Sequence, residues 1–295
     1  APAAASRETP VSRPRKSAPG KMIATSLPVP AVCWNPLAPG YADDPWPQYA
    51  ELVESGFGLH EFGPVTVWRH EHVSAVLRAG LSVENPETSP HASMLERDPP
   101  HHTRLRSLSN KAFTPRAIAN LEPLVSGIAD EALDAFAAAG GGDLVPDVAF
   151  AVPFQVITEM LGMPDVDTVG LRRLTSLLVA GLEPIFSEEQ AAAIAAAEVE
   201  FMGVIGEAIG WKRNRLKDDM LSALIQAESE GDRLSPEELA EQVALIYVAG
   251  HETTVNLISG GTLALLENPE QAARLRRDDQ LDCVEELLRY DSPVH

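Results

Sequence analysis

The feature that most constrains this sequence is the stretch from residue 236 to residue 267, which no further proline interrupts until Pro269. Ser235 with Glu238 three residues later is typical of a capped helix start. From Val243 to Leu266 the stretch is apolar on nearly all sides, which predicts burial in a core. At a rise of about 1.5 Å per residue, such a helix would be on the order of 45 Å long and would cross the molecule.

Within residues 243–257 of this predicted helix, the central "AGHETT" holds the poorest helix formers and the only charge. Thr253 can turn its hydroxyl back to the carbonyl of Ala249, which bends or opens a helix. Gly250 removes side-chain bulk at the same point and leaves room against the backbone. Two interpretations follow from these residues alone. Either this is a core helix whose Glu252 meets water or a basic partner, or it is a helix shaped around a bound molecule.

A second motif is "DPPHHTRLRSLSNKAFTPR", residues 98–116. Its two prolines predict a helix start, after which His102 and Arg106, four residues apart, lie on one face and can bind the same anion. A solvated basic face is the alternative. The basic residues of this segment are His101, His102, Arg104, Arg106, Lys111 and Arg116.

A third motif, "EELLR", places Glu286 and Arg289 three residues apart near the end of the chain. That spacing permits a salt bridge worth only a few tenths of a kcal/mol when it is exposed. In isolation the pair indicates no function.

Charge and composition exclude several classes of protein. The net charge is −20, from 43 acidic and 23 basic side chains, which disfavours binding to nucleic acid or to anionic lipid. No window has the roughly 20 consecutive apolar residues of a membrane span, so we expect a soluble protein. Cys33 and Cys283 lie far apart and form no metal or disulfide motif, which favours the cytoplasm.

The pattern of apolar residues predicts a mainly α fold. From Leu121 onward apolar residues recur at three-and-four spacing, whereas "FGPVTVWRH" alternates like a strand and predicts a small N-terminal sheet. Residues 1–26 read as a disordered extension, rich in Ala, Ser, Pro and Arg, and we expect the natural chain to start at Met22. We expect residues 27–295 to belong to a single domain.

In this order and at these separations, the three motifs resemble the cytochrome P-450 family of haem-thiolate monooxygenases in its soluble bacterial form. "AGHETT" matches the distal-helix signature, "DPPHHTRLR" is similar to the helix that binds the haem propionates, and "EELLR" contains the Glu-x-x-Arg of the family. His101 stands where an acidic residue is more usual. The resemblance runs from about Trp34 to the last residue and implies a cytochrome P-450-like helical fold.

The resemblance also implies roles for individual residues. Ala249 and Gly250 would make space for dioxygen at a haem b (iron protoporphyrin IX), and Glu252 and Thr253 would manage protons as the catalytic pair. The remaining roles are haem-propionate binding for His102 and Arg106, substrate contact for Leu245, Val248 and Val294, and structural support for Glu286 and Arg289.

One departure from the family concerns the iron ligand. In the family, the cysteine loop that holds the iron lies well beyond Glu-x-x-Arg. We therefore expect the axial cysteine to lie beyond His295. We also expect the C-terminal portion of the fold to be missing from this chain. Neither Cys33 nor Cys283 has the surroundings of that loop. A cysteine-less helper protein that binds and activates a glycosyltransferase is the alternative, and a plain helical protein that binds an apolar ligand is a third.

The expected substrate is a bulky apolar small molecule, because the segments that would shape the pocket carry few charges. Abundant alanine, and arginine in place of lysine, are typical of a GC-rich actinomycete, which favours hydroxylation or epoxidation of a macrolide or another polyketide. The resemblance implies electrons from NAD(P)H through a ferredoxin and a ferredoxin reductase. Arg104, Lys111 and Arg116 are candidates for docking an acidic ferredoxin. We expect a monomer.

Overall fold

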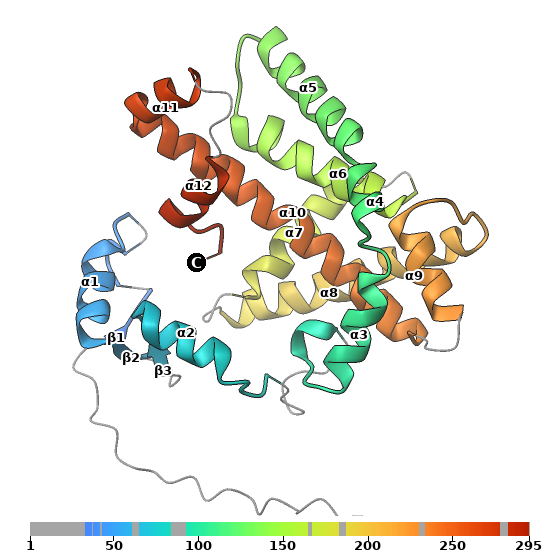
Figure 1. Cartoon of the computed structure of the whole chain (residues 1–295), viewed down its shortest axis with the longest axis horizontal. Coiled ribbons are helices and arrows are strands. Elements are labelled where there is room, and N and C mark those ends of the chain that lie inside the picture. The colour runs from blue at the N-terminus through green and yellow to red at the C-terminus, as the bar shows by residue number, and fades with distance from the viewer. Residues whose placement is uncertain are drawn as a thin grey trace, which may run out of the picture. The chain divides into compact units, whose positions relative to one another are not determined.

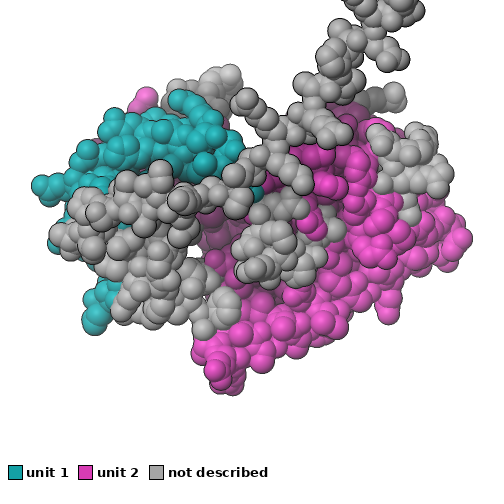
Figure 2. All heavy atoms as spheres, turned by 90° about the horizontal axis from the view of Figure 1, so that it is seen from below, with its two compact units in different colours: residues 1–82 teal, residues 83–295 magenta. Residues whose placement is uncertain are grey.

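The computed structural model describes residues 33–36, 38–41, 43–60, 65–83, 93–164, 167–182, 187–229, 234–277 and 283–294. The chain divides into two compact units, residues 1–82 and residues 83–295 (Figure 2). Residues 1–26, for which the sequence predicts disorder, lie outside the described residues. The expectation that residues 27–295 form one domain stays a prediction.

The first unit contains a small sheet and two helices. Its elements are β1 (Cys33–Trp34), α1 (Trp46–Ser55), β2 (Phe57–His60), β3 (Val65–Val67) and α2 (His70–Arg78). The strand order is β1-β2-β3, with β1 parallel and β3 antiparallel to β2. The small N-terminal sheet predicted from alternating residues is therefore confirmed.

The second unit is helical (Figure 1). It begins with η1 (Met94–Glu96, a 3₁₀ turn), α3 (His101–Asn110), α4 (Pro115–Ala119), α5 (Glu122–Ala138), η2 (Val145–Phe150, a π-helix) and α6 (Ala151–Leu161). It continues with α7 (Thr168–Ala180), α8 (Glu188–Arg213), α9 (Met220–Ser229), α10 (Pro236–Glu267), α11 (Pro269–Leu275) and α12 (Val284–Tyr290). The mainly α fold class is confirmed.

Helix α10 is the central element of the second unit. It covers the predicted span and packs against α6, η2, α7, α8, α9, α11 and α12 (Figure 1). Its start is the predicted capping box, in which the Glu238 backbone N–H donates to Ser235 Oγ (3.1 Å) and the Ser235 backbone N–H donates to the Glu238 carboxylate (2.8 Å). Two orphan N–H groups of the helix start are thereby satisfied.

The predicted burial of α10 on nearly all sides is wrong in part. Val243 and Tyr247 are fully buried, whereas Leu263 is 57% exposed and Leu266 is 73% exposed. The reason is that the described helices pack mainly against one side of α10 and leave Ala249, Asn256 and Leu263 exposed on the other. Among the described residues, no helix is long and apolar enough to cross a membrane.

A buried lysine fixes the end of α6. Lys212 is 1% exposed and donates from Nζ to the carbonyl oxygen of Gly162 (2.9 Å) and to the carboxylate of Asp219. Gly162 ends α6 with a φ of 63°, in the left-handed region that favours glycine. This arrangement joins α6, α8 and the start of α9, the helices around α10.

Candidate functional site

The middle of α10 has a closed side and an open side. The closed side is buried against neighbouring helices and consists of residues four apart, namely Tyr247, His251 and Val255. The open side follows the helical repeat on the opposite face and consists of Ala249, Thr253 and Asn256, of which Ala249 and Asn256 are exposed and Thr253 is half-buried. The open side is thus a strip of small and polar residues in the middle of the central helix.

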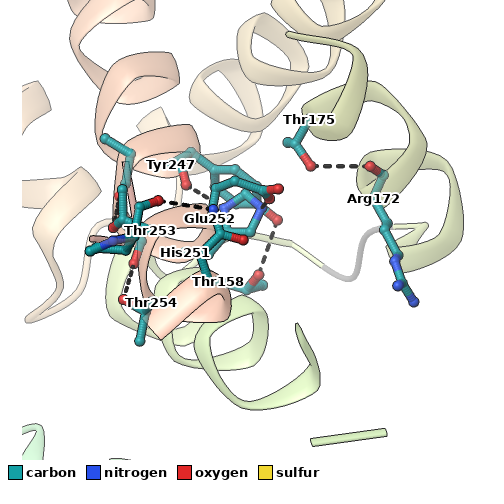
Figure 3. A network of polar contacts seen from close by, with 12 residues as sticks. Thr158, Arg172, Thr175, Tyr247, His251, Glu252, Thr253 and Thr254 are labelled. Carbon is teal, nitrogen blue, oxygen red and sulfur yellow. Dashed lines mark hydrogen bonds and ion pairs between the residues drawn. The ribbon is translucent and has the colours of Figure 1, made fainter. Parts of the chain in front are cut away.

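Both threonines of the "AGHETT" motif bond back to the helix. Thr253 Oγ1 donates to the Ala249 carbonyl at 3.1 Å, and Thr254 Oγ1 donates to the Gly250 carbonyl at 3.4 Å (Figure 3). The first of these bonds is the one that the sequence predicts. Because the single hydroxyl proton of Thr253 is used in this way, its lone pairs remain as acceptors toward the open side.

Gly250 permits a close approach of two helices. A Cβ at this position would lie 2.9 Å from Ile157 Cδ1 of α6, which is closer than carbon atoms pack. The space that the sequence predicts at the missing side chain is therefore taken up by Ile157. The Gly250 residue itself is exposed, so its backbone is still accessible. Its role in holding a cofactor stays a prediction.

His251 lies on the closed side inside a cage of aromatic rings. It is fully buried, with ring centroids of Phe150, Phe154 and Tyr247 at 5.8, 5.9 and 5.7 Å from its own. Its Nδ1 lies 2.7 Å from the Tyr247 carbonyl oxygen, and its Nε2 lies 3.5 Å from the Glu252 carboxylate (Figure 3). Burial lowers the pKa of His251, against the opposing effects of the Tyr247 carbonyl and of Glu252.

Tyr247 extends this buried polar network to α6. Its hydroxyl lies 3.2 Å from Thr158 Oγ1, which itself donates to the Phe154 carbonyl at 2.8 Å. Burial raises the pKa of Tyr247 to about 12. The phenol is thus neutral at ordinary pH and acts as a fixed hydrogen-bonding group.

A cavity of about 330 Å³ lies beside α10. Leu245 and Val248, the predicted substrate contacts, both line it, as do Phe201 and Met202 of α8. Its other lining residues are Ser93, Leu95, Glu96, Leu178, Gly181, Leu182, Ile194, Glu198, Glu241 and Ala244. Fully buried Gln242 accepts a hydrogen bond from the Met94 N–H (3.3 Å) and so fixes η1 at the cavity wall. The structure therefore brings two of the three predicted substrate contacts, Leu245 and Val248, together in one cavity.

The predicted anion-binding residues lie on α3, which begins directly after the two prolines. His102 is half-buried and Arg106 is exposed, and no side-chain hydrogen bond or ion pair of either is found within the described residues. Their donors remain available for carboxylates. No contact found in the described chain joins them to the open side of α10.

Arg104 of the same helix does not belong to a free basic surface. Its guanidinium binds the carboxylate of Glu238, and both side chains are partly buried. The prediction that Arg104 is available to dock an acidic ferredoxin is therefore wrong, because the arginine joins α3 to the start of α10. Lys111 is exposed, and the Arg116 side chain lies outside the described residues.

The predicted pair on α12 forms a bidentate ion pair. Arg289 Nε and Nη2 donate to the two Glu286 carboxylate oxygens at 2.8 and 2.7 Å. The bonds with Arg289 lower the pKa of Glu286. Half-buried Cys283 lines a cavity of about 600 Å³ with this pair, and the Cys33 side chain lies outside the described residues. Among the described residues, no group of His, Cys, Asp and Glu has the arrangement of a metal site.

The segment after α12 returns to α10. Asn256 Nδ2 donates to the Pro293 carbonyl at 3.0 Å, so the exposed Val294 lies next to the open side. Val294 is not among the residues that line the cavity with Leu245 and Val248. The sequence interpretation overlooked Asn256, Gln242 and His251. Asn256 and His251 could have been noticed in the sequence, because they are polar residues within an apolar run. Gln242 could not.

Comparisons with known proteins identify the family. Residues 65–281 match the family described as cytochrome P450. The chain is 46% identical over 205 residues to cytochrome P450 CYP107DY1 of Priestia megaterium, covering 68% of this chain and 49% of the relative. It is 37% identical over 290 residues to the cytochrome P450 monooxygenase PikC of Streptomyces venezuelae, covering 92% of this chain and 68% of the relative.

Solved structures agree with the sequence relatives. P450BioI in complex with a fatty-acid-ligated acyl carrier protein matches with a TM-score of 0.79 and 30% identity, covering 87% of this chain and 71% of that chain. The chain therefore belongs to the cytochrome P450 family. It spans about half the length of the first two curated relatives that it matches, 49% and 51%.

The open side of α10 fits the haem of this family. It offers an uncovered strip of small side chains that a flat apolar group can approach, continued by the exposed Leu263. His102 and Arg106 on α3 carry the kinds of donor, imidazole and guanidinium, that suit carboxylates such as propionates.

Proposed function

We propose that this chain is part of a haem-dependent monooxygenase that inserts one oxygen atom of O₂ into an apolar small molecule. The observation that carries the proposal is the open side of α10, where back-bonded Thr253 follows a helical segment, Leu245 to Val248, that lines a cavity. The glycosyltransferase helper has no such observation in its favour.

Haem b, when bound, would supply an iron that activates dioxygen. His102 and Arg106 bind the propionates through charge-assisted hydrogen bonds, and Ala249 and Gly250 leave the backbone approachable. Glu286 and Arg289 serve a structural role.

Thr253 and Glu252 manage protons in this proposal. The Thr253 hydroxyl points its proton at the Ala249 carbonyl and so presents acceptor lone pairs that hold a water molecule or a reacting oxygen in place. The Glu252 side chain is 20% exposed and therefore reaches both the helix and solvent. It exchanges protons with solvent and delivers them beside Thr253.

The substrate class follows from the cavity and from the relatives. Leucine, isoleucine, methionine and phenylalanine side chains line most of the cavity, and Glu96, Glu198 and Glu241 also line it, which suits a largely apolar molecule that carries some polar groups. One relative, at 40% identity over 203 residues, is the polyketide biosynthesis cytochrome P450 PksS of Bacillus subtilis. Hydroxylation or epoxidation of a macrolide or another polyketide is the proposed reaction.

Electrons come from NAD(P)H through a ferredoxin reductase and a ferredoxin in this proposal. Exposed Lys111 remains a candidate contact for an acidic ferredoxin, whereas Arg104 is engaged by Glu238. A monomeric enzyme in the cytoplasm is part of the same proposal.

The test is the absorbance of the reduced protein under carbon monoxide. Residues 1–295 are compared with a chain extended through the expected cysteine loop and with the same extended chain in which that cysteine is serine. We expect the red-shifted thiolate signature only from the extended chain with its cysteine. An extended chain that binds no haem would refute the proposed function and favour the helper protein. A thiolate signature from residues 1–295 would show that Cys33 or Cys283 reaches the iron.

A further inference from the structure

His251 is a buried titratable group for which the proposed function gives no role. It lies on the closed side of α10 with no exposed surface, and aromatic rings surround it. A buried imidazole is costly unless both ring nitrogens find suitable partners. The partners of the two ring nitrogens therefore indicate the role of the side chain.

The first nitrogen has a defined state. His251 Nδ1 lies 2.7 Å from the Tyr247 carbonyl oxygen, which is only an acceptor (Figure 3). Two acceptors do not approach this closely, so Nδ1 carries a proton and donates it. The neutral tautomer of His251 then has its free lone pair on Nε2.

The second nitrogen faces the carboxylate of Glu252. Within the described part of the chain, Nε2 finds no hydrogen-bond partner, and it lies 3.5 Å from Glu252 Oε2. If the imidazole is neutral and the carboxylate ionised, two acceptors oppose each other in a buried place. One proton between them removes this conflict, and a movement of about half an ångström brings the two atoms to hydrogen-bonding distance.

The other charged and polar groups described around the cage do not donate a hydrogen bond to Nε2 in place of this proton. The guanidinium of Arg172 from α7 lies over the Phe150 ring, 4.3 Å from its centroid. The Tyr247 hydroxyl is directed to Thr158 of α6. Compared with Arg172 and Tyr247, Glu252 is the group whose side chain lies within ion-pair distance of Nε2.

We propose that His251 is a positioning residue that shares one proton with Glu252 and thereby holds the carboxyl group, proton-loaded, next to Thr253. The pair is neutral when loaded. When the proton leaves toward the open side, the pair carries one negative charge, and a proton from solvent restores the neutral pair. The role of the pair in proton delivery rests on the proposed function, whereas the contact between His251 and Glu252 does not depend on it.

The test is ¹⁵N NMR of histidine-labelled protein in the full-length, haem-loaded, carbon monoxide-bound form. In the wild type we expect the Nε2 resonance of His251 to move in one step as the pair loses its proton, while Nδ1 stays protonated. In Glu252→Gln the midpoint of that step falls by about one pH unit or more, because the carboxylate that favours the proton is gone. Tyr247→Phe keeps the carbonyl bonded to Nδ1 and should leave the midpoint in place.

An Nε2 resonance that does not move with pH, or that moves at the same pH in the wild type and in Glu252→Gln, overturns the proposal. A second variant, His251→Phe, fills the aromatic cage without a lone pair. It should keep the thiolate signature but shift the pH dependence of NADPH coupling to product, and an unshifted profile also overturns the proposal. Failure of the wild type to show the thiolate signature would instead refute the proposed function and leave the NMR result to be judged separately.

Discussion

The two sides of α10 use the same helix for different purposes. On the closed side, Tyr247 and His251 have polar atoms bonded to Thr158 and to a backbone carbonyl, as the cost of burying unpaired groups requires. On the open side, Ala249 and Asn256 are exposed, and in the described part of the chain the Thr253 hydroxyl bonds to its own helix while Asn256 bonds to the Pro293 carbonyl. The helix is held in place from one side and left approachable from the other.

This difference separates stability from function along one helix. Residues of the closed side contribute buried area and paired hydrogen bonds, so their replacement should affect folding. Residues of the open side contribute little packing, so their replacement should affect chemistry while the fold remains. Three substitution experiments on α10 test this separation, and a fourth on α3 tests the proposed haem-propionate binding.

The largest effect is expected from Tyr247→Ala. Removing a fully buried aromatic side chain that also bonds to Thr158 should lower the free energy of unfolding by about 3 to 5 kcal/mol. Denaturant unfolding measures the change. Val199→Ala on α8, where the side chain is 76% exposed, is the control and should change it by less than about 0.5 kcal/mol. Equal losses in the two variants would contradict the closed side as the supporting one.

The next effect concerns haem retention in the full-length enzyme. Replacing both His102 and Arg106 with alanine removes charge-assisted bonds of about 1.5 to 3 kcal/mol each and should sharply lower the haem content of purified protein. His101→Ala, on the exposed part of the same helix, is the control and should retain haem. Normal haem content in the double variant would show that the basic face of α3 is merely solvated.

A smaller effect is expected from Gly250→Ala, which lies between the two sides. Its Cβ would meet Ile157 Cδ1 at 2.9 Å, so we expect a loss of about 1 to 2 kcal/mol despite the better helix propensity of alanine. Adding Ile157→Val removes the offending methyl group and should recover part of the loss. Gly203→Ala on α8 has open space at the Cβ and should instead stabilise the protein. Denaturant unfolding of the three variants measures these changes, and a Gly250→Ala variant as stable as the wild type would contradict the close contact with Ile157.

The smallest effect on stability is expected from Thr253→Ala on the open side. The free energy of unfolding should change by less than about 0.5 kcal/mol, since the lost bond is local and half exposed. In the full-length enzyme, reducing equivalents should go to peroxide instead of product, because the acceptor that holds the reacting oxygen or water is gone. Thr254→Ala, which loses a similar back-bond, is the control and should stay coupled. Unchanged coupling in Thr253→Ala would refute its catalytic role.

Patterns within single helices were predictable. The capping box of Ser235 and Glu238, the length of α10, the Thr253 back-bond and the Glu286–Arg289 pair all depend on residues within four positions of each other. Arg104 was not predictable in this way. Its partner Glu238 lies 134 positions along the chain, so nothing near Arg104 distinguished a structural ion pair from a free surface cation.

The sequence by itself determined the family and the location of the central helix, because local spacing of small, acidic and hydroxyl residues within an apolar run is preserved in the chain itself. Only the tertiary structure decided which side of that helix is open. It also decided that Ile157 takes up the space at Gly250 and that His251 faces Glu252 inside an aromatic cage. These outcomes depend on how α6, η2 and α10 pack, and a helix that is apolar on nearly all sides gives no preference for one face over another.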